Sequence, residues 1–587
     1  MDYMFKNISS LTKVEMNLNK FCKIISMKGS FENCSNLESF AIDGFNISEI
    51  KSMKKLFYNT SLIKLNLSNF ETNNVEDMSY MFSNTKLEEL NVSMLSTINV
   101  KDISYMFSGC HSLTSLNLTL FDTKQVTNMS YLFAECESLT YLDLSKFDTD
   151  LLEDMSFMFY GCISLINLNL SNFNTNLVID ISYMFSYCSS LEVLDISNFD
   201  THKVRNMSHI FNYCNKLNEL NIYHFQTSEV LDMSNMFSFC DSLEFLNVSN
   251  FDTKNVIDIS YMFYHCNQIE NLNISNFDTK NVKNMSYLFG ECTKLKTLDI
   301  NNLDTHNVID LSGLFMGCLS INNLNVSHFI VDKVENISHI FENCLGLKSI
   351  NIDKFNTEQV TDFSYSFKSC SSLTSLDLSS FITNNAINMS SMFENCFNLQ
   401  IIDFNFETSN VIDMSKLFHN CPLLNQINIQ NFRTEKVENM SQMFDGCKNL
   451  ESIDFSNIRT NMVKNMSSIF KDCSNLKYIE LSQLNTSLVQ DMSYIFYGDS
   501  YLNMNLSSFK TSNVKDMSYM FQGCTSLTSL DIKNFDTSRV TKMVEMFKNL
   551  KNIKYLDISN FNTSQVTDMR GMFKSTKFSF TIKYIEF

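Results

Sequence analysis

The sequence predicts an α/β fold, a leucine-rich-repeat solenoid curved like a horseshoe, because one unit recurs from end to end. A phenylalanine marks each unit, and successive markers are 26 residues apart, or 25 in four places. Such a period is typical of a solenoid with one supersecondary unit per coil. The 587 residues therefore hold about 23 coils of 25–26 residues. The markers are Phe5, Phe31, Phe57, Phe82, Phe107, Phe133, Phe159, Phe185, Phe211, Phe237, Phe263, Phe289, Phe315, Phe341, Phe367, Phe393, Phe418, Phe444, Phe470, Phe496, Phe521, Phe547 and Phe573.

Each coil contains two segments with different hydrophobic periods. Residues 112–118 follow the pattern Leu-x-x-Leu-x-Leu, and their last three positions alternate as a short strand does. In residues 123–136 the apolar side chains recur mostly at every third position, which favours one face of a short helix. A threonine begins this second segment in most coils, where its hydroxyl would cap the helix; examples are Thr149, Thr175, Thr201, Thr227, Thr253, Thr279 and Thr305.

The strands must form a parallel sheet, because every coil is traversed in the same direction. Paired strands lie about 4.8 Å apart, whereas packed helices need about 8 to 10 Å between axes, so the helical side must be longer. We therefore expect the parallel β-sheet on the concave side and short helices on the convex side. A parallel β-helix is the alternative fold, and the helical spacing disfavours it.

No linker or low-complexity tract interrupts the repeats, which predicts a single solenoid domain over residues 1–587. The ends differ from the other coils, as capping coils do. Residues 1–30 form a degenerate N-terminal coil, with the departure centred on residues 17–22. The alternating pattern within residues 574–587 predicts a capping strand that covers the last open edge.

The composition excludes several classes of partner. The formal charge of −19 argues against a nucleic-acid surface, which needs clustered lysine and arginine. No run of about 18 apolar residues is present, so we expect no transmembrane segment. The N-terminus has no basic region followed by an apolar region, so it does not read as a signal peptide.

Residues 250–263 and 517–532 resemble the repeats of BspA-like leucine-rich repeat surface proteins, and the resemblance covers essentially the whole chain. It implies display on the cell surface, adhesion to host or matrix proteins such as fibronectin and fibrinogen, and a part in cell–cell contact. The resemblance thus suggests the cell surface, whereas the missing signal peptide and anchor suggest the cytoplasm. The localisation is left open between the two.

The cysteines form a regular series rather than a metal or disulfide framework. Seventeen of the eighteen lie three residues after a marker phenylalanine, and no CxxC-like pair is present. Each cysteine would face two equivalent neighbours, so none has a unique disulfide partner. We predict a ladder of small buried side chains, which fits Asp499 at this position poorly.

The sequence contains no nucleophile elbow, phosphate-binding loop or paired acid and base, so we predict neither catalytic residues nor a metal or cofactor site, and no enzyme. An Asn or Asp recurs at the middle of the strand, as in Asn117 and Asp143. We interpret this row as a hydrogen-bonded ladder between coils, with binding of a cation or a basic ligand as the alternative.

The variable positions of the strand carry the candidate binding residues. Aromatic side chains stand where the strand faces solvent, and exposed aromatics are favoured anchors in protein interfaces. These candidates are Tyr141, Tyr223, Phe245, Tyr478 and Tyr555. The sequence thus predicts a non-enzymatic protein-binding scaffold, and the resemblance implies an adhesin-like surface protein that binds host, matrix or neighbouring-cell proteins. An intracellular repeat scaffold or regulatory module is the alternative.

Overall fold

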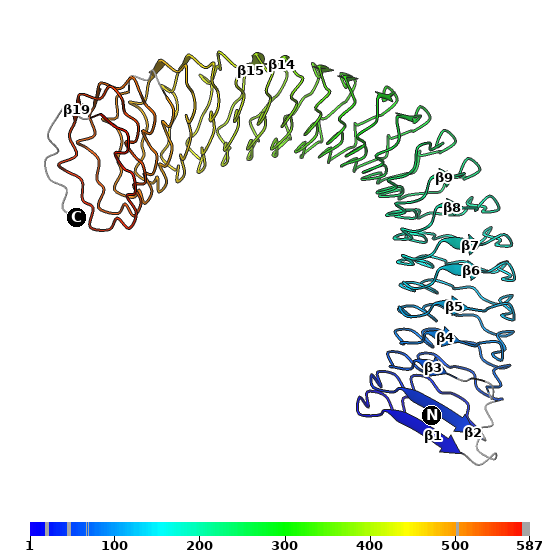
Figure 1. Ribbon diagram of the computed structural model, residues 1–587. Coiled ribbons are helices and arrows are strands. Elements are labelled where there is room, and N and C mark those ends of the chain that lie inside the picture. The colour runs from blue at the N-terminus through cyan, green and yellow to red at the C-terminus, as the bar shows by residue number, and fades with distance from the viewer. Residues whose placement is uncertain (18–22, 44–47, 66, 68–69, 500–503, 578–587) are drawn as a thin grey trace. The chain divides into compact units, whose positions relative to one another are not determined.

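The computed structural model describes residues 1–17, 23–43, 48–65, 67, 70–499 and 504–577. The chain divides into two compact units, unit 1 (Met1–Asn284 and Leu288–Leu303) and unit 2 (Met285–Tyr287 and Asp304–Phe587). Both units are stacks of the same coil, as Figure 1 shows. That residues 1–587 form one domain stays a prediction.

Short parallel strands occur at the positions that the sequence predicts. Unit 1 contains β1 (Lys13–Asn17), β2 (Ser39–Asp43), β3 (Lys64–Leu65), β4 (Glu89–Leu90), β5 (Ser115–Leu116), β6 (Tyr141–Asp143), β7 (Asn167–Asn169), β8 (Val193–Leu194), β9 (Glu219–Leu220), β10 (Asn271–Leu272) and β11 (Thr297–Leu298). Unit 2 contains β12 (Asn323–Asn325), β13 (Ser349–Asn351), β14 (Ser375–Leu378), β15 (Ile401–Phe404), β16 (Ser452–Ile453), β17 (Tyr478–Ile479), β18 (Ser529–Leu530) and β19 (Tyr555–Leu556).

Strand pairing joins equivalent positions of successive coils, so the sheet is parallel and in register. Tyr141 of β6, for example, pairs with Asn167 of β7. Side chains alternate along each strand, since Tyr141 is exposed and Leu142 is buried. The exposed side chains of residues 140–143 and their equivalents form a surface that we call the sheet face. This arrangement confirms the parallel-stranded solenoid.

A second ladder runs along another segment of the coil, which we call the turn face (residues 128–135 and their equivalents). One residue per coil forms a parallel bridge to the next coil, from Ser26 to Asn284 in unit 1 and from Asp310 to Asp568 in unit 2. The backbone N–H groups of Tyr131 and Phe133 each donate to a carbonyl of the next coil, both at 2.9 Å. The intervening N–H groups donate to carbonyls three residues back in their own coil. The turn face is therefore fully hydrogen-bonded without a helix.

The prediction of short helices is wrong for the described residues, which form turns at those positions. The reason is backbone conformation: Tyr131 and Glu135 adopt positive φ angles of 57° and 60°, and equivalent residues do so in almost every coil. A residue in this left-handed region breaks a helix, because a helix needs a run of negative φ angles. Successive turns also place an apolar side chain inward at every third residue, so the two structures share one sequence pattern.

The threonine that recurs at the same place in most coils links neighbouring coils instead of capping a helix. The hydroxyl of Thr253 donates to the carbonyl of Asp278 in the next coil at 2.9 Å and accepts from the N–H of the same residue at 2.8 Å. Thr253 is fully buried. Many other coils repeat this double hydrogen bond, as at Thr123 and Thr434. The prediction of an N-cap is therefore wrong, although the position is structurally important.

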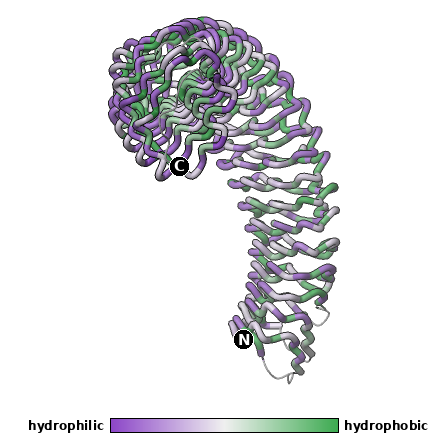
Figure 2. Tube along the Cα trace, turned by 60° about the vertical axis from the view of Figure 1, so that its left-hand side comes forward, coloured by the Kyte–Doolittle hydropathy of each residue, from purple (hydrophilic) through white to green (hydrophobic). Residues whose placement is uncertain are grey.

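Marker phenylalanines form the centre of the core. Phe107, Phe133 and Phe159 have no exposed surface, and their ring centroids lie 5.7 Å apart in a continuous stack. Leucine, methionine and cysteine side chains surround these rings, and hydrophobic residues recur at equivalent places in each coil in Figure 2. Stacking of identical coils thus buries one continuous row of side chains in each unit.

The distance between stacked rings of successive coils in unit 1 depends on their place in the coil. The centroids of Tyr105 and Tyr131, both on the turn face, lie 4.2 Å apart, whereas those of Phe121 and Phe147 lie 6.5 Å apart. The sequence argument placed the wider spacing on the turn side because it assigned helices there. With turns in place of helices, that requirement disappears.

The two predicted ends differ in how far the structure describes them. Within residues 1–30, strand β1 pairs with all five residues of β2, while residues 18–22 lie outside the described residues. Most of the predicted capping strand, residues 578–587, also lies outside them. No described residue belongs to a helix that is long and apolar enough to cross a membrane.

Candidate functional site

All five predicted aromatic residues are exposed, at 53% to 72% of their surface. Tyr141, Tyr478 and Tyr555 project from β6, β17 and β19, because alternation turns the following apolar residue inward. Phe245 precedes the buried Leu246 at the equivalent position between β9 and β10, and Tyr223 lies in the turn after β9. The structure does not gather the five residues into one cluster, since they belong to different coils.

The sheet face of unit 1 is hollowed beside Tyr141. This hollow, which we call hollow 1, has a volume of about 1120 Å³ and extends across β2 to β6. The residues that line hollow 1 include Glu89, Asn91, Ser115, Asn117, Thr140 and Tyr141. Short side chains such as Ser115 leave the space, and Tyr141 forms one end of it.

A second depression, hollow 2, lies beside Phe245 and has a volume of about 800 Å³. It spans β10, β11 and the coil before them. The residues that line it include Phe245, Asn247, Asn271, Asn273, Thr297 and Asp299. Each hollow therefore combines one exposed aromatic side chain with amide and hydroxyl groups from neighbouring coils.

The mid-strand Asn/Asp row is not mainly a ladder between coils, although Asn169 hydrogen-bonds Asp143 of the preceding coil. Each side chain instead accepts a hydrogen bond from the backbone N–H two residues later in its own coil, as Asn117 does from Thr119 at 3.1 Å. Asp143 accepts in the same way from Ser145 at 3.0 Å. The hydrogen bonds from the backbone and side chain of Ser145 lower the pKa of Asp143. The row thus braces the turn after each strand, which is a local Asx turn.

The cysteine ladder is confirmed as structural. Seventeen cysteines are buried with free thiols, and the Sγ of Cys162 donates to the carbonyl of Phe133 in the preceding coil at 3.2 Å. Burial raises the pKa of Cys162 to about 12, so its thiol stays protonated and is a poor nucleophile or metal ligand. No group of three metal-ligating side chains with suitable geometry occurs in the part of the chain that the structure describes.

Asp499 takes the place of a cysteine in this ladder. It is 1% exposed, and neither carboxylate oxygen lies within hydrogen-bonding geometry of a partner among the described residues. Burial raises the pKa of Asp499 well above its ordinary value. A carboxyl group in this environment is more stable as the neutral acid than as the anion.

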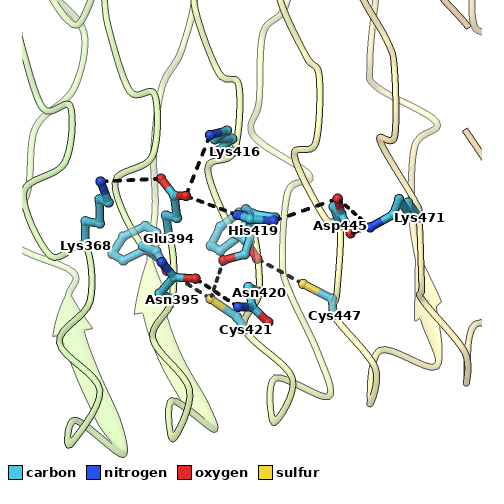
Figure 3. A network of polar contacts seen from close by, with 12 residues as sticks. Lys368, Glu394, Asn395, Lys416, His419, Asn420, Cys421, Asp445, Cys447 and Lys471 are labelled. Carbon is cyan, nitrogen blue, oxygen red and sulfur yellow. Dashed lines mark hydrogen bonds and ion pairs between the residues drawn. The ribbon is translucent and has the colours of Figure 1, made fainter. Parts of the chain in front are cut away.

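A row of charged side chains in unit 2 escaped the sequence reasoning. It occupies the position directly after the marker phenylalanine, which varies in other coils, as in Ser108, Ala134 and Tyr160. Figure 3 shows acidic and basic side chains alternating along the row, with His419 between Glu394 and Asp445. The ring nitrogens of His419 lie 3.2 Å from Glu394 Oε1 and 3.8 Å from Asp445 Oδ2. A run of acidic and basic residues at this position in successive coils was the available signal.

The environment of Glu394 shows that this row holds coils together. The carboxylate of Glu394 contacts Lys368, Lys416 and His419. The side chain of Glu394 is only 9% exposed. Burial alone would raise its pKa, but the hydrogen bonds from His419 and Ser391 and the charges of the two lysines lower the pKa to about 2. Since its acids are already paired with cations of neighbouring coils, the row is a structural network rather than an acid–base pair for catalysis.

Aromatic side chains also line the turn face, where the sequence analysis expected a helix. Tyr105, Tyr131 and Phe157 stack with centroids 4.2 and 4.3 Å apart. Burial raises the pKa of Tyr105 to about 12, with a smaller contribution from Tyr131. Because each ring covers the faces of its neighbours, these residues offer mainly ring edges to a partner.

Comparisons with known proteins agree with the repeat architecture. A family model described as "Mycoplasma protein of unknown function, DUF285" matches ten overlapping segments, residues 1–116, 25–140, 83–193, 132–245, 188–297, 231–350, 265–374, 310–406, 397–479 and 464–584. A search of curated protein sequences found no match.

Solved structures of repeat proteins are similar over much of the chain, with low sequence identity and low TM-scores. A leucine-rich repeat protein of Bacteroides ovatus is 16% identical, covers 79% of this chain and 85% of its own, and has a TM-score of 0.24. A leucine-rich cell surface protein of Faecalibacterium prausnitzii is 16% identical, with coverages of 65% and 83% and a TM-score of 0.26. An internalin of Listeria monocytogenes is 17% identical, with coverages of 68% and 88% and a TM-score of 0.18.

Proposed function

The chain belongs to the family described as "Mycoplasma protein of unknown function, DUF285", and we propose that it is an adhesin-like scaffold whose sheet face binds host, matrix or neighbouring-cell proteins. The family match confirms the resemblance to BspA-like leucine-rich repeat proteins. A leucine-rich-repeat solenoid of this kind is a protein-interaction scaffold. The adhesive role and the identity of the partners are the proposed part.

One observation carries the proposal: large aromatic side chains are exposed on the sheet face, at outward positions of the strands where polar residues are usual. Phe245 is 72% exposed and Tyr141 is 56% exposed, and each lies at a hollow. Tyr478 and Tyr555 extend the set to unit 2, and Tyr223 is exposed in the turn after β9. Rigid aromatic side chains with free surface are favoured anchors in interfaces.

The repeat supplies the mechanism. Hollows 1 and 2 lie in the same unit and present similar groups, so a repetitive partner binds both at once. Linked weak contacts raise the overall affinity, because the second contact forms at a high effective concentration. No single deep pocket is needed for such binding.

Substituting Tyr141→Ser and Phe245→Ser in the full chain is expected to weaken binding of purified fibronectin and fibrinogen about tenfold for each substitution, as for a moderate interface anchor. Surface plasmon resonance on the immobilised chain measures the change. Both residues are exposed, so the thermal midpoint should stay the same.

Phe397→Ser is the matched control. Phe397 is 43% exposed but lies in a turn away from the strands, so its loss should leave binding unchanged. Equal binding by the sheet-face variants and the unsubstituted chain would remove these aromatics from the site. An equal loss in Phe397→Ser would also contradict the proposal.

A further inference from the structure

We propose that hollows 1 and 2 bind neutral oligosaccharides, so that unit 1 recognises the glycans of a glycoprotein partner. This inference rests on the proposed function of the sheet face and names the chemistry by which that face recognises a partner. Three features of the hollows carry it: a free aromatic ring, fixed amide donors and the scarcity of positive charge.

The aromatic rings of the hollows have free faces. Tyr141 is flanked in its column by Ser115 of the preceding coil and Asn167 of the next, and no ring stacks on it among the described residues. Phe245 is next to Asn271 in hollow 2 and is likewise unstacked within that part of the chain. The rings of the turn face, in contrast, cover one another. A free ring face offers the dispersion and C–H contacts that suit the apolar face of a pyranose ring.

The amide groups beside these rings have a fixed direction. The Oδ1 of Asn117 accepts hydrogen bonds from the backbone and side chain of Thr119, at 3.1 and 2.9 Å. The Oδ1 of Asn273 accepts in the same way from Ser275, at 3.1 and 2.8 Å. With each oxygen engaged, the Nδ2 group points away from the turn as a donor that has no partner among the described residues. Several such donors, set beside serine and threonine hydroxyls, match the hydroxyl groups of a sugar.

The charge distribution selects neutral glycans over acidic ones. Hollow 2 is lined by amide and hydroxyl side chains, with Asp299 as its charged member. Hollow 1 contains one lysine, Lys64, against the carboxylates of Glu38 and Glu89. The chain as a whole has a formal charge of −19. Sialylated or sulfated glycans would therefore meet repulsion without a cluster of cations to bind them.

The same geometry disfavours an extended peptide as the occupant. The backbone groups of paired strands point along the sheet towards neighbouring strands, so the sheet face offers only side chains. A peptide could not add a strand there, which is the usual source of its main-chain hydrogen bonds. Sugars, in contrast, are bound through side-chain donors, acceptors and ring faces alone.

Binding of the full chain to immobilised high-mannose and galactose-terminated oligosaccharides tests the inference, with sialylated and sulfated oligosaccharides on the same array. We expect binding to neutral probes, and at least tenfold weaker binding after Phe245→Leu or Asn273→Asp. The second substitution keeps the Oδ1 acceptor of the turn, removes the donor and adds a negative charge. Asn221→Asp is the control, because Asn221 braces its turn in the same way through Tyr223 and lies outside both hollows.

The outcomes separate this inference from the proposed function. Absence of binding to every neutral probe, or equal binding to sulfated probes, would overturn the inference. Unchanged capture of fibronectin after enzymatic removal of its glycans would overturn it in favour of peptide recognition and leave the proposed function standing. If the substitutions Tyr141→Ser and Phe245→Ser leave capture of fibronectin unchanged, the proposed function itself is overturned.

Discussion

Replacing Asp499 by cysteine is expected to stabilise unit 2 by about 3 kcal/mol at pH 7, because a buried polar group without a partner costs at least 1 to 3 kcal/mol and a carboxyl group costs more. Asp499 is 1% exposed, and both of its oxygens lack a hydrogen-bond partner among the described residues. The substitution restores the residue that fills this position in the adjacent coils, Cys473 and Cys524. The midpoint of thermal unfolding of the full chain, followed by circular dichroism, measures the gain.

The gain should depend on pH in one direction. The folded chain raises the pKa of Asp499, so it holds this proton more tightly than the unfolded chain, whose Asp pKa is about 3.9. Below that value both states are protonated and the carboxyl group adds no pH-dependent cost. As the pH rises above it, the unfolded state gains from losing the proton and the folded state loses relative stability. The advantage of Asp499→Cys should therefore be smaller at pH 4 than at pH 7.

Asp531→Asn provides the control for loss of a negative charge. Asp531 lies exposed after β18, and asparagine keeps the acceptor for its turn. This variant should have the midpoint of the unsubstituted chain at both pH values. A destabilised Asp499→Cys, or a gain that does not grow with pH, would show that the buried carboxyl group has a partner in the folded protein.

Replacing Thr253 by valine is expected to destabilise unit 1 by about 2 to 3 kcal/mol. Valine has nearly the same shape but lacks the hydroxyl, so the N–H and the carbonyl of Asp278 both lose their partner. Each unsatisfied buried group costs about 1 to 3 kcal/mol, and partial access of water reduces the sum. Urea unfolding of the full chain at constant m-value measures the difference.

Thr253→Ser keeps the hydroxyl and removes one methyl group, so its cost should stay near 1 kcal/mol. The contrast between the two substitutions isolates the double hydrogen bond from packing. If valine proves as stable as serine at this position, the threonine does not link the coils in the way that its geometry indicates.

The period, the strands and the buried cysteines could be predicted from the sequence, because each depends on the spacing of apolar residues along the chain. The structure of the turn face could not be predicted from the sequence. The apolar spacing around Met129 and Phe133 fits a helix and a series of turns equally well, and only the positive φ angle of Tyr131 separates them. Tyrosine is not a residue that usually adopts this conformation, so the sequence carries little warning.

The candidate site was predictable only in part. That Tyr141 and Phe245 are exposed follows from alternation in the strand. The hollows beside them depend on short side chains from several coils, such as Ser115 and Asn271, and on the register that brings these together. The Asn/Asp row was visible, but its partner two residues later within the same coil was mistaken for one in the next coil.

Hydroxyl-radical footprinting of the chain, free and bound to fibronectin, tests most directly whether recognition resides in the variable residues of the sheet face. The exposed side chains of Tyr141 and Phe245 should be oxidised in the free chain and protected in the complex. Tyr187, which is 38% exposed on the turn face, should be oxidised equally in both. Protection of Tyr187 with continued oxidation of Tyr141 and Phe245 would place the binding surface on the turn face and contradict this account.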